Sequence, residues 1–171
     1  MKERDFVKME LAPWDLRHSS VAAMLNPALI AVVVAAAANR YETMGQVGMP
    51  WELSFLVVPM AFHEETRTAV PSRVDSYLPK WVERNPIVHA GLAPRARSTA
   101  PYVREGIRYG MRTQALALSD GGLLHGALRG RMPRKNGADT ADIVKAAAFL
   151  GRWFGTVGSS ATVFSVLGVT P

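Results

Sequence analysis

Residues 26–45 read Asn-Pro-Ala-Leu-Ile-Ala-Val-Val-Val-Ala-Ala-Ala-Ala-Asn-Arg-Tyr-Glu-Thr-Met-Gly, and the segment 27–38 within them carries no polar side chain. Asn26 is a suitable N-cap, and Pro27 fits the first helical turn because its missing N–H would have no helical partner there in any case. We predict one helix from Pro27 to about Met44, followed by Gly45 as the C-terminal glycine. A helix that is apolar nearly all round belongs in the middle of a fold or in a subunit interface.

The same segment raises the question of a membrane span. A span needs about 20 apolar residues, whereas this run is ended by Asn26 on one side and by Asn39 and Arg40 on the other. A signal peptide also fits poorly, because acidic residues are mixed with the basic ones at the N-terminus and the apolar part begins late. We therefore expect a buried helix and no contact with a membrane.

The chain has 171 residues, of which 49% are hydrophobic and none is cysteine. This length fits one domain with an N-terminal extension, so we expect an arm over residues 1–20 and a single, mainly helical domain over 21–171. The lack of cysteine excludes disulfides, thiolate metal sites and a cysteine nucleophile, and it agrees with a cytoplasmic protein.

The next part of the chain alternates short helices with turns. The apolar stretch 49–62 fits a buried helix or a strand, and we favour a helix that is broken near Pro59. Helices are also expected over 63–70, from Ser76 to Asn85, over 86–92 and over 99–114. In the last of these, Val103, Ile107 and Met111 are expected to form the buried stripe.

Two short apolar runs flank the turn Ser119–Gly122, which indicates a β-hairpin near residues 115–126. A basic, exposed loop is expected over 128–137, then a helix over 139–154 and a short final helix that ends at Gly168. The fold class is therefore mainly α with a small β-hairpin (α+β). The order of helices, basic helix, hairpin and closing helix also suggests a winged-helix-like unit in the C-terminal half, with the hairpin as the wing.

The net charge of +6 is concentrated in residues 95–135. This segment has nine basic residues against Glu105 and Asp120, whereas the rest of the chain has eleven basic and twelve acidic residues. The nine are Arg95, Arg97, Arg104, Arg108, Arg112, Arg129, Arg131, Arg134 and Lys135.

Arginine is suited to bidentate contacts with phosphates or carboxylates, and the spacing of Arg104, Arg108 and Arg112 predicts a ridge along one helix. DNA phosphates, acidic residues of a partner protein, and a solvated face without a ligand all remain open. We slightly favour a partner protein, because Glu105 lies within the ridge.

The aromatic residues are expected mainly in the core, as is usual for tryptophans such as Trp51 and Trp81. Phe149 and Trp153 are the exception, because the helix over 139–154 has a sufficient apolar stripe on another side. We predict that they anchor a partner interface, together with Trp14 in the arm.

No catalytic signature is present in the sequence. His63-Glu64-Glu65 lacks the second histidine of a zinc-binding H-E-x-x-H helix, and no P-loop, nucleophile elbow or dinucleotide-binding glycine pattern occurs. We expect no enzymatic activity, no metal and no cofactor.

Several short strings resemble a known family, from about residue 26 to the C-terminus. They are Asn26-Pro27-Ala28, Pro59 with His63 and Thr66-Arg67, Trp81 with Asn85-Pro86, Arg95-Ala96-Arg97 before Pro101-Tyr102, Arg104-Glu105 with Arg108-Tyr109-Gly110, Asp142, Lys145, the segment 149–154 and the segment 167–171. Together they are similar to the middle components of bacterial three-component ABC (ABC-3C) systems, a group that overlaps the Lamassu-type anti-phage systems. The sequence departs from that pattern at Pro94, where a helix-compatible residue is expected, and this puts the continuity of a helix through Arg95 and Arg97 in doubt.

The resemblance implies a small adaptor without catalysis of its own. Its partners would be an ATPase resembling the structural-maintenance-of-chromosomes (SMC) and Rad50 proteins and an effector, often a nuclease, with double-stranded DNA reached through the complex. Two alternatives stay open: a free-standing winged-helix DNA-binding protein and, more distantly, a membrane-associated helical protein.

Overall fold

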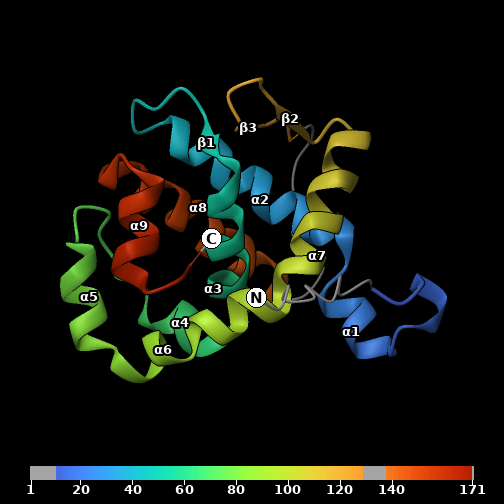
Figure 1. Cartoon of the computed structure of the whole chain (residues 1–171), viewed down its shortest axis with the longest axis horizontal. Helices are drawn as coiled ribbons and strands as arrows, with labels where there is room; N and C mark the ends of the chain where they lie inside the picture. Colours follow the sequence, from blue (N-terminus) through green and yellow to red (C-terminus); the bar gives the residue numbers. More distant parts are fainter. Residues whose placement is uncertain (1–10, 129–137, 171) are drawn as a thin grey trace, which may run out of the picture.

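The computed structural model describes residues 11–128 and 138–170, which are mostly helical with one small antiparallel sheet (Figure 1). This confirms the predicted class of a mainly α protein with a small β element. The basic loop expected over 128–137 lies, apart from Leu128, outside the described residues.

The central element is α2 (Pro27–Glu42), which has nine buried residues. The Asn26 side chain accepts a hydrogen bond from the N–H of Ala28 at 2.8 Å, so the predicted cap is present. The helices α3 (Ser54–Phe62), α7 (Leu92–Arg112) and α8 (Ala138–Val157) pack around α2. The close approach of α8 requires glycine at 151, since a Cβ there would clash with the backbone of Ala37. The prediction of a core helix is confirmed.

By length and composition alone, the helical stretch Ser19–Glu42 could cross a membrane. In the fold, however, its α2 part is the covered centre, which is the position of a core helix in a soluble protein.

The predicted break near Pro59 is wrong. The stretch begins with the short strand β1 (Met49–Pro50) and the 3₁₀ turn η2 (Trp51–Leu53), and α3 then runs through Pro59 to Phe62. Seven of the nine α3 residues are buried. Packing on all sides therefore offsets the one hydrogen bond that Pro59 cannot donate.

The short helices expected over 63–70, 76–85 and 86–92 are present. They are α4 (Glu64–Ala69), α5 (Leu78–Arg84) and α6 (Pro86–Ala90). The start of α7 at Leu92, rather than near Thr99, was not expected. Pro94 is the third residue of α7, where the first-turn N–H groups have no helical acceptor, so this proline does not interrupt the helix. The helix is thus continuous through Arg95 and Arg97.

The sheet contains β2 (Leu116–Leu118) and β3 (Leu123–Gly126), which form the predicted hairpin, and β1, which pairs with the other edge of β3. Both pairs are antiparallel, with Leu124 opposite Met49 on one side and Leu118 on the other. The third strand was not predicted, because two residues are too few to show an alternating pattern.

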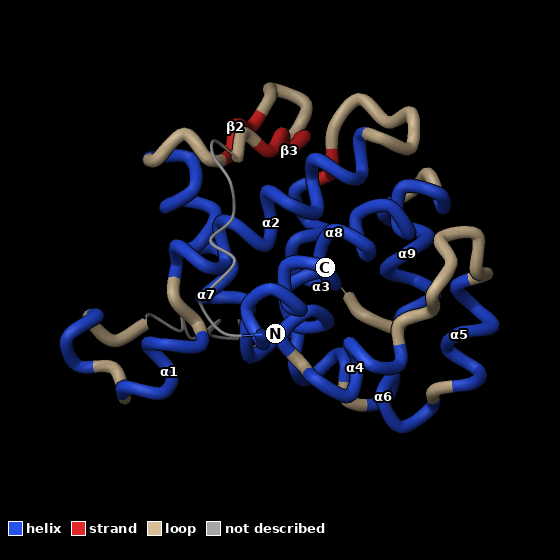
Figure 2. The backbone as a smooth tube through the Cα atoms, turned by 180° about the vertical axis from the view of Figure 1, so that it is seen from behind, coloured by secondary structure: helices blue, strands red, loops and turns tan. Residues whose placement is uncertain are grey.

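The chain closes with α9 (Ser160–Leu167), capped by Ser159 and ended by Gly168 in the left-handed conformation. At the other end, α1 (Ser19–Met24) lies near α7 in the view from behind (Figure 2), and η1 (Trp14–Leu16) precedes α1 in the chain. Neither η1 nor α1 has a buried residue, and Arg17, which lies between them, contacts Glu105 of α7.

Candidate interaction surface

The nine basic residues predicted as one surface divide into three groups. Arg129, Arg131, Arg134 and Lys135 lie outside the described residues. Arg95 is half-buried, whereas Arg97, Arg104, Arg108 and Arg112 are exposed.

Arg95 is turned toward its own protein. Its Nη2 donates to the carbonyl of Val88 at 2.8 Å and lies 3.5 Å from the hydroxyl of Thr66, so it links α7 to α6 and α4. Burial lowers the pKa of Arg95, and the charge of Glu65 partly opposes this shift. These contacts give Arg95 a structural role.

The four exposed arginines all lie on the outer side of α7, which we call the arginine face. With about 100° per residue, they point away from buried Val103 and Gly110. Among the described residues, none of the four takes part in a salt bridge. Their charge is therefore available to a ligand or partner.

Glu105 does not neutralise the arginine face, although it lies within the ridge in the sequence. Its carboxylate accepts two hydrogen bonds from Arg17, at 2.7 and 2.9 Å, on the side of α7 that faces the N-terminal segment. The Arg17 guanidinium also lies over the rings of Trp14 and Tyr102, at 5.2 and 5.9 Å. The hydrogen bonds to Glu105 raise the pKa of Arg17. Thus Glu105 fastens the N-terminal segment and leaves the four arginines unopposed.

An aromatic row continues the arginine face onto the neighbouring element. The guanidinium of Arg104 lies 5.6 Å from the ring centre of Phe55, and Phe55 in turn makes an edge-to-face contact with Trp51. Trp51 is 45% exposed, so it is a surface residue and not the core residue that its type predicts. The backbone N–H of Trp51 donates to the carbonyl of Gly122, which fixes Trp51 beside the hairpin turn.

Met111 is also exposed, at 38%, and the prediction that it lies in the buried stripe is wrong. Each step of four residues turns about 40° further around a helix. Met111, two such steps after Val103, is therefore turned by about 80° and lies on the same side of the helix as Arg104, two turns before it.

The prediction that Trp153 is an exposed interface anchor is wrong. Its side chain is fully buried, packs edge-to-face against Trp81 at 5.6 Å and donates a hydrogen bond of 2.7 Å to the carbonyl of Ser76. Trp81 of α5 and the loop residue Ser76 cover this side of Trp153, which the periodicity of α8 alone could not show. Phe149 is half-buried against the same cluster, and Trp14 is 46% exposed.

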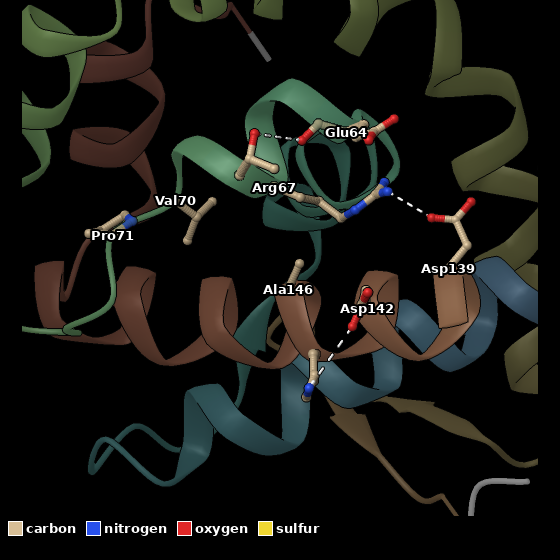
Figure 3. A pocket seen from close by; sticks show the side chains of 9 residues that line it. Glu64, Arg67, Val70, Pro71, Asp139, Asp142 and Ala146 are labelled. Carbon is tan, nitrogen blue, oxygen red and sulfur yellow. Dashed lines mark hydrogen bonds and ion pairs between the residues drawn. The ribbon is translucent and has the colours of Figure 1, made fainter. Parts of the chain in front are cut away.

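A shallow pocket of about 430 Å³ lies between α4 and the start of α8 (Figure 3). Arg67 spans it and pairs with Asp139 at 2.9 Å, while its other nitrogen donates to the carbonyls of Ala61 and Phe62 at the end of α3. Both basic and acidic side chains line it, and within the described residues no group of three or more His, Asp or Glu side chains could hold a metal ion.

The family model of the ABC-three component (ABC-3C) system Middle Component 3 matches residues 14–171. The chain belongs to this family. As a middle component, it is part of a system with further protein components, which agrees with a surface of unopposed charge. The match begins at Trp14 and so includes part of the N-terminal segment, which the sequence resemblance had left out. No curated protein and no solved structure matches the chain significantly.

Proposed function

We propose that this middle component is a non-catalytic, cytoplasmic adaptor that joins an SMC- or Rad50-like ABC ATPase to an effector, often a nuclease, in a Lamassu-type anti-phage system. Membership of the ABC-3C family over residues 14–171 carries the proposal. The exposed arginine face supports it, because a compact protein with unopposed charge on one long helix is suited to contact another molecule.

Co-expression with the products of the neighbouring genes tests this role. We expect the ATPase and the effector to co-elute on size exclusion only when the middle component is present. A stable complex of ATPase and effector that forms without it would contradict the adaptor role. A catalytic activity of the isolated chain would contradict its non-catalytic nature.

Direct binding of duplex DNA is the second candidate function, favoured by the order of the strands. Support for it comes from the elements α2, β1, α3, α7, β2 and β3 and the sheet order β1-β3-β2, which correspond to the order in a winged-helix unit if α4, α5 and α6 are taken as an insertion before the third helix. Such a unit would begin at α2 and not lie in the C-terminal half, where the sequence suggested it. In this comparison, α7 takes the place of the helix that enters a DNA groove.

The DNA-binding role predicts that the isolated chain binds duplexes of unrelated sequence with similar affinity, because arginine contacts to phosphates carry little sequence information. Each phosphate contact should add about 0.9 to the slope of log K against log salt. Fluorescence anisotropy across a salt series measures both quantities, and an absence of binding at low salt would exclude this candidate.

A further inference from the structure

The arginine face and the aromatic row form one continuous surface with a distinctive composition. Its basic residues are all arginine, the guanidinium of Arg104 lies over the Phe55 ring, and its apolar residues are Trp51, Phe55 and Met111. Arginine, methionine and aromatic residues are enriched at protein interfaces, whereas lysine is depleted there. This surface therefore has the chemistry of a protein-docking site.

One of its features favours a protein partner over DNA, and two others suit any anionic group. The exposed tryptophan and methionine can be desolvated by apolar side chains of a partner, but the phosphate backbone of a duplex offers no such groups. The guanidinium of Arg104 is already held over an aromatic ring, so less side-chain freedom is lost on binding. Arg17 pairs with Glu105, the one carboxylate of the ridge, so the ridge is positive toward a carboxylate or a phosphate alike, and Glu105 no longer argues for either partner.

We propose that this arginine–aromatic face docks an acidic segment of another component of the system. Carboxylates of the partner pair with Arg97, Arg104, Arg108 and Arg112, while its apolar side chains cover Trp51 and Met111. The proposal rests on the proposed adaptor function and adds the surface and the chemistry of the partner that this surface holds.

The length of the face sets the size of the docked segment. Arg97 and Arg112 are fifteen positions apart, which corresponds to roughly 22 Å along α7. An acidic helix of about fifteen residues, or an extended strand of about seven, would follow the whole row. Contacts of this kind should weaken with salt, because the partner's carboxylates compete with screening ions.

The test compares two charge reversals that are matched in number and spacing. Arg104→Glu with Arg108→Glu changes the face, and Lys80→Glu with Arg84→Glu makes the same change on exposed i, i+4 positions of α5. In the complex assembled from all components, we expect the first pair to weaken binding of one component about 100-fold, because like charges would then oppose each other. The second pair should change it by less than about 3-fold.

Both variants should keep the unfolding midpoint of the wild-type chain, which shows that a loss of binding is not a loss of folding. Normal affinity of the Arg104/Arg108 variant for every component would overturn the proposal. Normal assembly with a loss of duplex DNA binding would overturn it in favour of DNA. If the wild-type chain binds no component at all, the adaptor function itself fails, and this result is distinct from the other two.

A crosslink identifies the partner segment directly. The chain has no cysteine, so Met111→Cys gives a single thiol that a photoreactive maleimide labels before the complex is assembled. We expect crosslinks to one acidic segment of one component, and none from the matched Lys80→Cys variant. Crosslinks from Met111→Cys to a basic or uncharged segment would contradict the proposed chemistry.

Discussion

Trp153 is the single residue whose surroundings differ most from its sequence pattern. Its indole N–H is paired with the carbonyl of Ser76, and its ring is enclosed by Trp81, Phe149 and Phe154. Trp153→Phe would leave that carbonyl without its donor and open a small cavity, so we expect a loss of about 2–3 kcal/mol in the free energy of unfolding. Urea denaturation measures this loss.

Trp51→Phe is the matched control, since Trp51 is half exposed and its side chain makes no hydrogen bond among the described residues. It should change the free energy of unfolding by less than about 1 kcal/mol. If Trp153→Phe instead kept full stability and lost partner binding, Trp153 would be an interface residue after all.

Tyr41, at the end of α2, should make stability depend on alkaline pH. Burial raises the pKa of Tyr41 above its ordinary value of 10.0, and the charge of Glu52 adds to the shift. A raised pKa in the folded state means that the stabilising contribution is complete below the unfolded value and is lost as the pH rises above it. We expect Tyr41→Phe to lose less stability than the wild type between about pH 9 and 11. Parallel urea midpoints for the two proteins over this range would contradict the assignment.

At the level of residues, the sequence predicted which side chains share a side of a helix better than it predicted whether a side chain is buried or exposed. The predicted ridge of Arg104, Arg108 and Arg112 is correct, because residues spaced four apart lie on one side of a helix whatever packs around it. The opposite holds for Trp51 and Trp153, because a tryptophan is buried or exposed according to elements far away in the chain. Nor could the sequence show that Glu105 pairs with Arg17, 88 positions away.

At the level of elements, prolines caused the main errors of prediction. Pro59 was predicted to break a helix, and the helix predicted over 99–114 would have Pro101 in its first turn, yet both prolines lie inside helices, α3 and α7. A proline inside a helix removes one hydrogen bond and disfavours the conformation. Burial of seven residues of α3, and of one whole side of α7, outweighs that penalty here. This burial is a tertiary effect, so local sequence rules cannot weigh it.

The contact between the N-terminal segment and α7 gives a prediction for an element. Arg17 is almost fully covered, with 7% of its side chain exposed, and its two hydrogen bonds to Glu105 are well formed. We expect a double-mutant cycle of Arg17→Met and Glu105→Gln to give a coupling of about 1–2 kcal/mol. Hydrogen exchange should also show faster exchange in α1 of either variant, while α2 stays protected.

The exposed pair of Arg73 and Asp75 is the control for this cycle. It has a similar N–O distance, 2.6 Å, but both side chains are largely in water, so it should show no measurable coupling. An equal effect in the two cycles would mean that Arg17 and Glu105 do not hold the N-terminal segment in place.

For the whole molecule, the sequence predicted the fold class and the hairpin, but not the strand that pairs with the hairpin from far away in the chain. The strand β1 is only two residues long, and it pairs with β3 although more than seventy positions separate them. The helices α4, α5 and α6 intervene between α3 and α7, so the helices that pack on α2 are far apart along the chain. Pairings over such distances are specified by the packed core, which no local pattern encodes.

The central position of α2 leads to the last prediction, on where the whole protein resides. Nine of its sixteen residues are buried by the surrounding helices and the sheet, so little of its apolar surface is left for lipid. We expect the chain, expressed with the other components, to stay in the supernatant after high-speed centrifugation. Recovery in membranes that have been washed with alkaline carbonate would contradict the core assignment. Expressed alone, the chain should associate with itself more readily at high concentration, because Trp51 and Met111 are then uncovered. Arg104→Glu with Arg108→Glu should leave the distribution between supernatant and membrane unchanged, since a core helix does not depend on the charge of α7.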